Sequence, residues 1–281
     1  MNWQPSRCLE APDEFRQKYH ADTSRFALII LNQPILIPRH RFDNVWHNAT
    51  YRFCADGGAN RLYDLLKTDD ERAKYLPDCI RGDLDSLRDS VKAYYESKGV
   101  SVERVSDQDS TDFMKCVELV RLRDPIFSHS ALFHSSTGGS GSASSALQDQ
   151  PQAMKGLDVV ALGGTGGRFD QSMSSIHHLY ILNRERRAAL ISNESIVVVL
   201  GPGKHEITCN LEIEGPTCGV IPVGSSEATL TLRGFQWDVE NWKTSFGTQL
   251  STSNGLIGPN LTIETTAPVV WTTELRESQE Q

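Results

Sequence analysis

The 281-residue sequence has no run of apolar residues that approaches the roughly 20 needed to cross a lipid bilayer. Residues 1–20 mix charged, polar and apolar side chains, a pattern unlike a secretory signal peptide. The composition, with 38% hydrophobic and 23% charged residues, is typical of a globular protein in water. We therefore expect no membrane partner.

The sequence also lacks closely paired cysteines and an excess of positive charge. None of the six cysteines forms a C-x-x-C pair, and several lie inside apolar runs, so we expect buried free thiols in a cytoplasmic protein without structural zinc. The formal net charge of −8 argues against nucleic acid as the main partner. Small anionic ligands are not excluded, because a local cation or a helix N-terminus can hold them.

The first half of the chain alternates apolar runs with stretches of helical periodicity. Continuous apolar runs suit strands that are buried on both faces of a parallel sheet. Phe169, Met173, Ile176 and Tyr180 recur at helical spacing, and we expect this stripe to be core. The alternation predicts an α/β domain with a parallel sheet. The expected strands are residues 26–31, 51–55, 77–81, 102–105 and 157–162.

The second half contains short β-branched runs separated by turn residues, which predict a small all-β sandwich. We place the boundary between a domain over residues 1–185 and a domain over residues 186–281. Within the first domain, residues 1–24 are expected to form a surface extension. Residues 128–153 form a low-complexity loop rich in Ser and Gly, which we expect to be disordered. The expected strands are residues 195–200, 219–223, 228–232, 261–266 and 269–272.

Two acids follow the strand at residues 77–81. In an extended backbone the side chains at i and i+2 point the same way, so Asp83 and Asp85 would aim two carboxylates at one point. Gly82 lets a ligand approach closely. Mg²⁺ is usually held by one or two carboxylates and by substrate phosphates. The pattern favours a metal–phosphate site, and a solvated turn is the alternative.

Polar clusters follow three other strands of the first half, at residues 56–60, 107–112 and 163–171. Ligands of open parallel sheets bind outside the carboxyl ends of the strands, where these clusters meet. Two common nucleotide motifs are absent. Phe169 stands where G-x-G-x-x-G needs its third glycine, and His205 stands where a P-loop needs Ser or Thr.

In this order, the clusters resemble those of the thiamin pyrophosphokinase family of the eukaryotic type, and the resemblance covers most of the chain. It extends into the second half, where Pro202-Gly203-Lys204-His205 and Gly234-Phe235-Gln236-Trp237 also match. The landmarks in the first half are Asp56-Gly57-Gly58-Ala59-Asn60-Arg61, Gly82-Asp83-Leu84-Asp85-Ser86, Asp107-Gln108-Asp109-Ser110-Thr111-Asp112-Phe113 and Gly167-Arg168-Phe169-Asp170-Gln171.

The resemblance implies that thiamin and ATP react to thiamin diphosphate and AMP. It implies an ATP-binding α/β domain followed by a thiamin-binding β-sandwich. It also implies a homodimer whose active site lies between the α/β domain of one subunit and the β domain of the other.

Site residues follow from the same resemblance. Asp83, Asp85 and Asp112 would hold Mg²⁺ against ATP, and Arg168 and Lys115 would neutralise phosphate charge. Asp109 or a metal-bound acid would accept the proton of the thiamin hydroxyl, and the sequence leaves that choice open. Trp237 would stack on the cationic aromatic thiamin. The other expected ligand-binding residues are Asp56, Gly57, Asn60, Gln108, Thr111, Asp170, Gln171, Ser251, Ser253 and Asn254.

Two alternatives stay open at this point. One is another Mg²⁺-dependent phosphoryl or pyrophosphoryl transferase that acts on a different alcohol. The other is a nucleotide- or thiamin-binding regulator without catalysis, against which the three acids Asp83, Asp85 and Asp112 argue.

Overall fold

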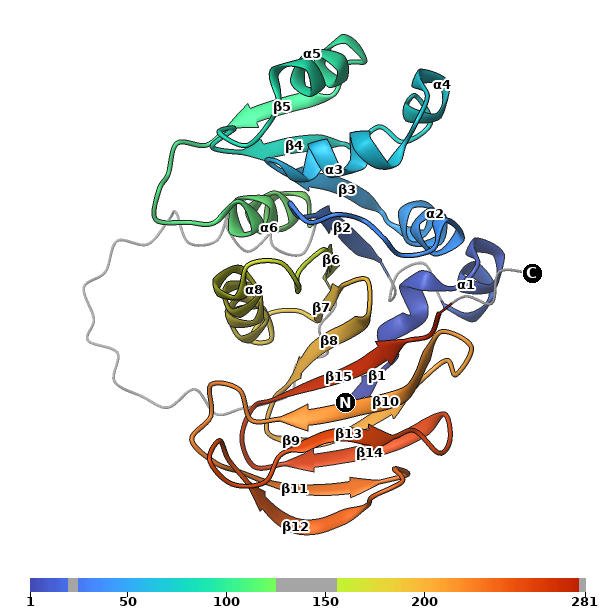
Figure 1. The fold of residues 1–281 in the computed structure, drawn as a ribbon, viewed down its shortest axis with the longest axis vertical. Helices are drawn as coiled ribbons and strands as arrows, with labels where there is room; N and C mark the ends of the chain where they lie inside the picture. The colour runs from blue at the N-terminus through green and yellow to red at the C-terminus, as the bar shows by residue number, and fades with distance from the viewer. Residues whose placement is uncertain (20–24, 125–155, 278–281) are drawn as a thin grey trace, which may run out of the picture.

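The computed structural model describes residues 1–19, 25–124 and 156–277, and a ten-stranded sheet runs through them (Figure 1). Its order is β13-β10-β15-β8-β7-β6-β2-β3-β4-β5. Six neighbouring strands are parallel: β2 (Phe26–Ile30), β3 (Tyr51–Ala55), β4 (Cys79–Gly82), β5 (Ser101–Arg104), β6 (Asp158–Leu162) and β7 (Ala188–Ile191). Four antiparallel strands continue the sheet: β8 (Ser195–Leu200), β10 (Glu214–Ile221), β13 (Ser251–Gly255) and β15 (Val269–Leu275).

A second, five-stranded sheet packs on the antiparallel part of the first one (Figure 1). Apolar side chains alternate with polar ones along its strands, as expected of a sheet with one face on the core and one face in water. The strands are β1 (Asn2–Trp3), β9 (Gly203–Thr208), β11 (Ala228–Arg233), β12 (Val239–Thr244) and β14 (Asn260–Thr265). The predicted α/β class with an added β-sandwich is confirmed.

Helices cover both faces of the parallel strands. One face packs against α2 (Arg39–Asn48), α3 (Gly58–Leu65) and α5 (Asp89–Ser97), and the other against α6 (Asp112–Arg123) and α8 (Phe169–Leu182). All five residues of β2 and all five of β6 are buried, which explains their continuous apolar runs. The remaining short elements are η1 (Pro5–Leu9), α1 (Pro12–Lys18) and α4 (Asp69–Arg72).

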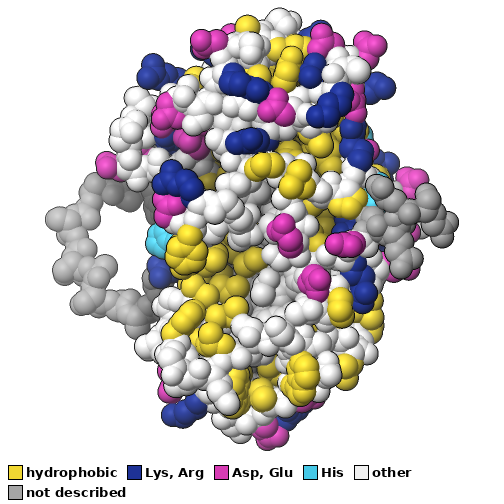
Figure 2. All heavy atoms as spheres, in the orientation of Figure 1, with side chains coloured by type: hydrophobic (Ala, Val, Ile, Leu, Met, Phe, Trp, Pro, Cys, Tyr) yellow, Lys and Arg dark blue, Asp and Glu magenta, His cyan; other side chains and the backbone are white. Residues whose placement is uncertain are grey.

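One expectation about burial is wrong, and another holds only in part. The N-terminal segment is not a surface extension, because Trp3, Leu9 and Phe15 are buried in the core and β1 pairs with β9. The stripe on α8 is core only in part: Phe169 is 78% exposed and Met173 37%, whereas Ile176 and Tyr180 are partly buried and pack against the core. Figure 2 shows hydrophobic side chains gathered on this face, over the region of α8.

All six cysteines are buried free thiols, as expected. None of the described helices is long and apolar enough to cross a membrane. The low-complexity loop at residues 128–153 lies outside the described residues. Residues 185 and 186 lie between α8 and β7, and the ten-stranded sheet contains strands from both sides of them, so the domain boundary there stays a prediction.

Candidate functional site

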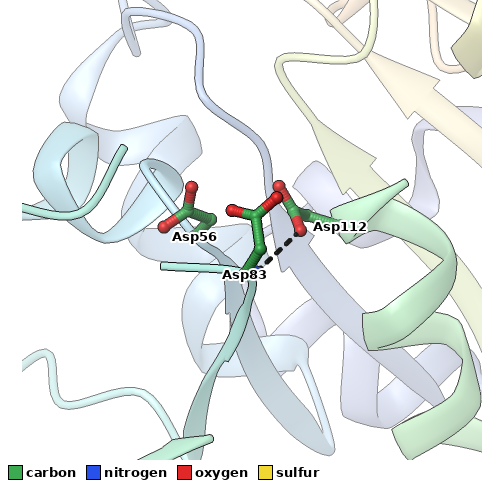
Figure 3. Close-up of side chains that lie close together, drawn as sticks. All are labelled: Asp56, Asp83 and Asp112. Carbon is green, nitrogen blue, oxygen red and sulfur yellow. Dashed lines mark hydrogen bonds between the residues drawn. The ribbon is translucent and has the colours of Figure 1, made fainter. Parts of the chain in front are cut away.

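Three aspartates meet at the carboxyl edge of the parallel strands. Asp56 directly follows β3, Asp83 directly follows β4, and Asp112 is the first residue of α6. One carboxylate oxygen of each lies within 4.8 Å of those of the other two (Figure 3). Three elements that are distant in sequence therefore build one acidic cluster, defined here as Asp56, Asp83 and Asp112.

The backbone around Gly82 determines how closely the three acids approach. A Cβ atom at this position would lie 2.6 Å from the Cβ of Asp56 and 3.0 Å from Oδ1 of Asp112, so only glycine fits without a shift. The next residue, Asp83, donates its backbone N–H to Oδ1 of Asp112 at 3.2 Å. Because Gly82 has no side chain, Asp56 and Asp112 can approach each other, with Asp83 between them (Figure 3).

The backbone from Asp83 to Asp85 is not extended. Leu84 has a left-handed φ of 66°, and the backbone N–H of Asp85 donates to Oδ1 of Asp83 at 3.1 Å. The expected alignment of the two carboxylates by strand alternation is therefore wrong, because the segment is a turn closed by Asp83. Asp85 is exposed and lies outside the acidic cluster, and its role as a metal ligand stays a prediction.

Burial and the neighbouring carboxylates both raise the pKa of the Asp56 carboxyl. Burial raises the pKa of its carboxyl to about 6, with Asp112, Asp83 and Asp85 adding to the rise, while the backbone N–H of Ser86 opposes it. Oδ1 of Asp56 is buried and has no hydrogen-bond partner among the described residues. A buried acceptor without a donor, facing two further carboxylates, is a place for a cation.

Lys115 is the cation nearest to the acidic cluster in the structure. Its buried Nζ lies 3.1 Å from Oδ1 of Asp112 and 3.9 Å from Oδ2 of Asp83. One ammonium against three ionised carboxylates leaves two negative charges. The charge balance and the oxygen ligands both suit a hard divalent cation.

The remaining acid of catalytic interest, Asp109, lies in an exposed loop before α6. Its N–H donates to Oδ1 of Asp107 at 2.9 Å, and the Ser110 hydroxyl also donates to Asp107. These bonds lower the pKa of Asp107 and shape the loop. Gln108 and Thr111 are exposed in the same loop.

The loop after β6 supplies a second group of expected residues. Arg168 is exposed and bonded to Asp170, and Gln171 is exposed beside them. This pairing raises the pKa of the guanidinium and lowers that of the Asp170 carboxyl. The loop therefore presents an arginine at the sheet edge, already paired with an acid of its own helix.

Asn60 and Gly57 occupy structural positions at the start of α3. The carboxamide of Asn60 donates to the carbonyl of Ser86 at 2.7 Å and accepts the N–H of Arg88 at 3.2 Å. Both ends of this side chain thus hold the loop after Asp85. Gly57 is the N-cap residue of α3.

Two residues without a predicted role, Asn32 and Gln33, lie between the glycine loops. A Cβ at Gly57 would lie 2.4 Å from Nδ2 of Asn32, and one at Gly167 would lie 2.5 Å from Nε2 of Gln33. Both amides follow β2. The chain runs outward from β2 through β3, β4 and β5 and then returns to β6 on the other side of β2. That is the topological switch point where open parallel sheets bind ligands. The sequence signal that could have indicated Asn32 and Gln33 is a pair of polar residues shortly after a buried strand.

The second half of the chain presents Trp237 with its side chain 57% exposed. The buried Asn254 holds its backbone on both sides: Oδ1 accepts the N–H of Trp237 at 3.1 Å, and Nδ2 donates to its carbonyl at 3.0 Å. Ser251 and Ser253 belong to the same strand as Asn254, β13. The backbone of an exposed tryptophan is thus held beside a polar strand.

Trp237 and the acidic cluster lie far apart within one chain. Trp237 is bonded to β13, the edge strand of the large sheet, whereas Asp56 follows β3. Seven inter-strand steps separate β13 from β3, and at about 4.8 Å each they amount to roughly 30 Å. A small molecule cannot contact both in the same chain.

Known proteins are similar to this chain over most of its length. Two family models match: "Thiamin pyrophosphokinase, catalytic domain" over residues 42–191 and "Thiamin pyrophosphokinase, vitamin B1 binding domain" over residues 204–270. Thiamine pyrophosphokinase 1 of Oryza sativa is 36% identical over 90% of this chain and 89% of its own length. The enzyme of that name from Arabidopsis thaliana is 35% identical over 91% of this chain and 88% of its own.

Solved structures give the same result. Thiamin pyrophosphokinase from Candida albicans superimposes with a TM-score of 0.77 at 30% identity, over 98% of this chain and 93% of that chain. The yeast enzyme gives the same score and identity, over 98% of this chain and 91% of its own.

Proposed function

The chain belongs to the thiamin pyrophosphokinase family, and from this premise we propose that it transfers the pyrophosphoryl group of ATP to the hydroxyl of thiamin, with Mg²⁺ as the metal. The products are thiamin diphosphate and AMP. The observation that carries the proposal is the acidic cluster, with Lys115 against it, at the ligand-binding edge of the sheet.

The described residues fit a magnesium ion. The unpartnered Oδ1 of Asp56 and the carboxylates of Asp83 and Asp112 form an oxygen donor set of the kind that Mg²⁺ prefers. Bound there, Mg²⁺ would neutralise charge on the phosphates of ATP and orient them. Asp85 is proposed as a further ligand from the family resemblance.

The protein contributes mainly position and charge to such a transfer. The thiamin oxygen forms a bond to the β-phosphorus while the bond from that phosphorus to the α,β-bridging oxygen breaks, and AMP leaves with this oxygen. The hydroxyl proton passes to a carboxylate, either Asp109 or one of the acidic cluster. Lys115, which contacts Asp112, and Arg168 are proposed to offset the phosphate charge.

Thiamin is proposed to stack on Trp237. The thiazolium ring is a cation, and the exposed indole offers it a negative face. Asn254 fixes the Trp237 backbone, so that the indole is presented without a large ordering cost on binding. Ser251 and Ser253 are the proposed polar contacts beside it.

We further propose a homodimer that completes the site. The roughly 30 Å between β13 and β3 requires Trp237 and the acids to come from different subunits if one thiamin is to touch both. The exposed Phe169, Met173 and Trp237 are large apolar side chains of the kind that subunit interfaces cover. The cytoplasmic location stays a prediction.

The test is an assay of AMP release from ATP. We expect AMP, and no ADP, to form only when thiamin and Mg²⁺ are both present, with thiamin diphosphate in equal amount. Turnover with another alcohol but not with thiamin would indicate a different transferase. Binding of thiamin or ATP without AMP release would indicate a regulator that has lost catalysis.

A further inference from the structure

A buried histidine on α8 contacts the first turn of α6, next to the acidic cluster. Nε2 of His178 lies 2.8 Å from Oγ1 of Thr111, and the two residues are 67 positions apart in sequence. The two helices lie on the same face of the sheet (Figure 1). Among the residues so far assigned to catalysis or binding, His178 has no role.

The partner of His178 controls where α6 begins. Thr111 is the N-cap residue of α6, and its Oγ1 accepts the backbone N–H of Met114 at 3.3 Å. Asp112 follows Thr111 directly. On the other side of Asp112, the ring of Phe113 meets the His178 ring edge-on, with the centroids 5.5 Å apart. His178 therefore touches both neighbours of the acid.

His178 is energetically unfavourable at this buried position. Nδ1 is buried without a hydrogen-bond partner among the described residues, and burial lowers the pKa of the ring to about 4, with a smaller contribution from His177. An apolar side chain of similar size would avoid the unpaired nitrogen. His178 thus destabilises the protein core, yet it is hydrogen-bonded to Thr111, the residue next to Asp112. This combination indicates a role in the site.

We propose that His178 is a positioning residue for the metal site: its hydrogen bond to Thr111 holds the first turn of α6 so that the Asp112 carboxylate faces Asp56 and Asp83. This inference rests on the proposed function only in that the acidic cluster binds a divalent cation. The neutral imidazole supplies whichever of donor or acceptor the Thr111 hydroxyl needs.

The test compares His178→Leu, which removes the hydrogen bond, with His178→Gln, whose amide can restore it. The matched control is His177→Leu, because His177 is the exposed neighbour on the same helix. The first readout is the dissociation constant of Mn²⁺ alone, measured by electron paramagnetic resonance without nucleotide. The second is hydrogen–deuterium exchange at the amides of Met114 and Lys115, in the first turn of α6.

We expect His178→Leu to weaken Mn²⁺ binding by about 3- to 10-fold, the usual effect of one lost hydrogen bond, and to speed exchange at both amides. His178→Gln and His177→Leu should match the unaltered protein. The melting temperature of His178→Leu should not fall, which separates positioning from a general structural role.

Unchanged Mn²⁺ affinity in His178→Leu, or equal losses in His178→Gln and His178→Leu, would overturn the inference. If His178→Leu does not fold, His178→Ala takes its place, with the same loss of Mn²⁺ affinity expected. An enzyme that lacks thiamin-dependent AMP release but shows these Mn²⁺ effects would refute the proposed function and leave the positioning role standing. A protein that binds no Mn²⁺ would refute both.

Discussion

At the scale of single residues, Asp83 lies at the centre of the acidic cluster. It contributes a carboxylate to the cluster and donates its N–H to Asp112. Asp83→Asn removes one charge from a group of like charges while keeping the shape of the side chain. We expect kcat to fall at least about 100-fold, because metal-assisted charge neutralisation is worth several kcal/mol.

The same substitution should leave the fold intact. Relief of repulsion among three carboxylates offsets the loss of the weak contact to Lys115, so the melting temperature should stay the same or rise. Calorimetry beside the AMP assay checks both expectations. An Asp83→Asn protein with normal turnover, or one that is unfolded, would contradict the assignment.

Trp237 allows a test of the substrate. Trp237→Ala should raise the KM for thiamin by about 3- to 30-fold, the range expected for a lost cation–π contact, with little change in the KM for ATP. Phe246→Ala is the matched control, since Phe246 is a 63% exposed aromatic of the same half that has no proposed ligand contact. Equal KM values for thiamin in the two variants would refute the stacking role.

Which individual residues form the site could be predicted only in part. Asp83 and Asp112 were expected to hold the metal, and both lie in the cluster. Asp56 was expected to line the nucleotide, yet it contributes the third carboxylate. No local spacing could show this, because the approach of Asp56 depends on the pairing of β3 with β4 and on the absence of a side chain at Gly82.

At the scale of elements, the junction between β4 and its following turn can be tested through Gly82. Gly82→Ala should disturb the acidic cluster, because the new methyl group would lie 2.6 Å from the Cβ of Asp56. We expect a stability loss of about 1–3 kcal/mol and weaker metal binding.

The control for Gly82→Ala is Gly258→Ala. A Cβ at Gly258 would meet no atom within 4 Å, so this change should alter stability by at most about 0.5 kcal/mol. Thermal melts with and without Mn²⁺ measure both variants. If Gly82→Ala binds Mn²⁺ as tightly as Gly258→Ala does, close packing at Gly82 does not set the geometry of the site.

Many elements with strong patterns were predicted well, but the buried strand β7 and the helix α2 were not predicted. The strand over 51–55 agrees with β3 residue for residue, as does that over 195–200 with β8. The strand β13, with sequence Ser-Thr-Ser-Asn-Gly, has no apolar alternation and could not be recognised. On α8 the periodicity correctly indicated a helix, but spacing alone cannot show which face the rest of the protein covers.

At the scale of the whole molecule, mixed subunits can test the shared active site. When thiamin is well below the KM of the unaltered protein, Asp83→Asn and Trp237→Ala chains are each expected to be impaired alone. In a dimer of one Asp83→Asn chain and one Trp237→Ala chain, one active site would contain both substitutions and the other would contain neither. Equal mixing should therefore restore about one quarter of the activity of the unaltered protein.

The control mixture pairs Asp83→Asn with Asp112→Asn. Both changes lie in the acidic cluster, so each site of the mixed dimer carries one of them and no activity should return. Sedimentation of the unaltered protein establishes the dimer itself. If the Asp83→Asn and Trp237→Ala mixture gives no more than the sum of its parents, the two halves of a site do not come from different subunits.

The class of the fold followed from the order of the elements, since alternating strands and helices predict a parallel sheet. The order of the elements did not, however, predict that one sheet continues through both halves of the chain. Composition changes near residue 186, yet β7 pairs with β6 on one side and with β8 on the other. Pairing between strands of different character is a tertiary property that a single sequence does not display.

In the proposed mechanism, Asp56, Asp83 and Asp112 hold a divalent cation against the phosphates of ATP. The most direct measurement is an anomalous difference map from crystals grown with Mn²⁺ and a non-hydrolysable ATP analogue. We predict a Mn²⁺ peak within bonding distance of oxygens from all three carboxylates and from the phosphates. A phosphate-bound Mn²⁺ peak away from the three carboxylates, or carboxylates without any metal at saturating Mn²⁺, would contradict the account.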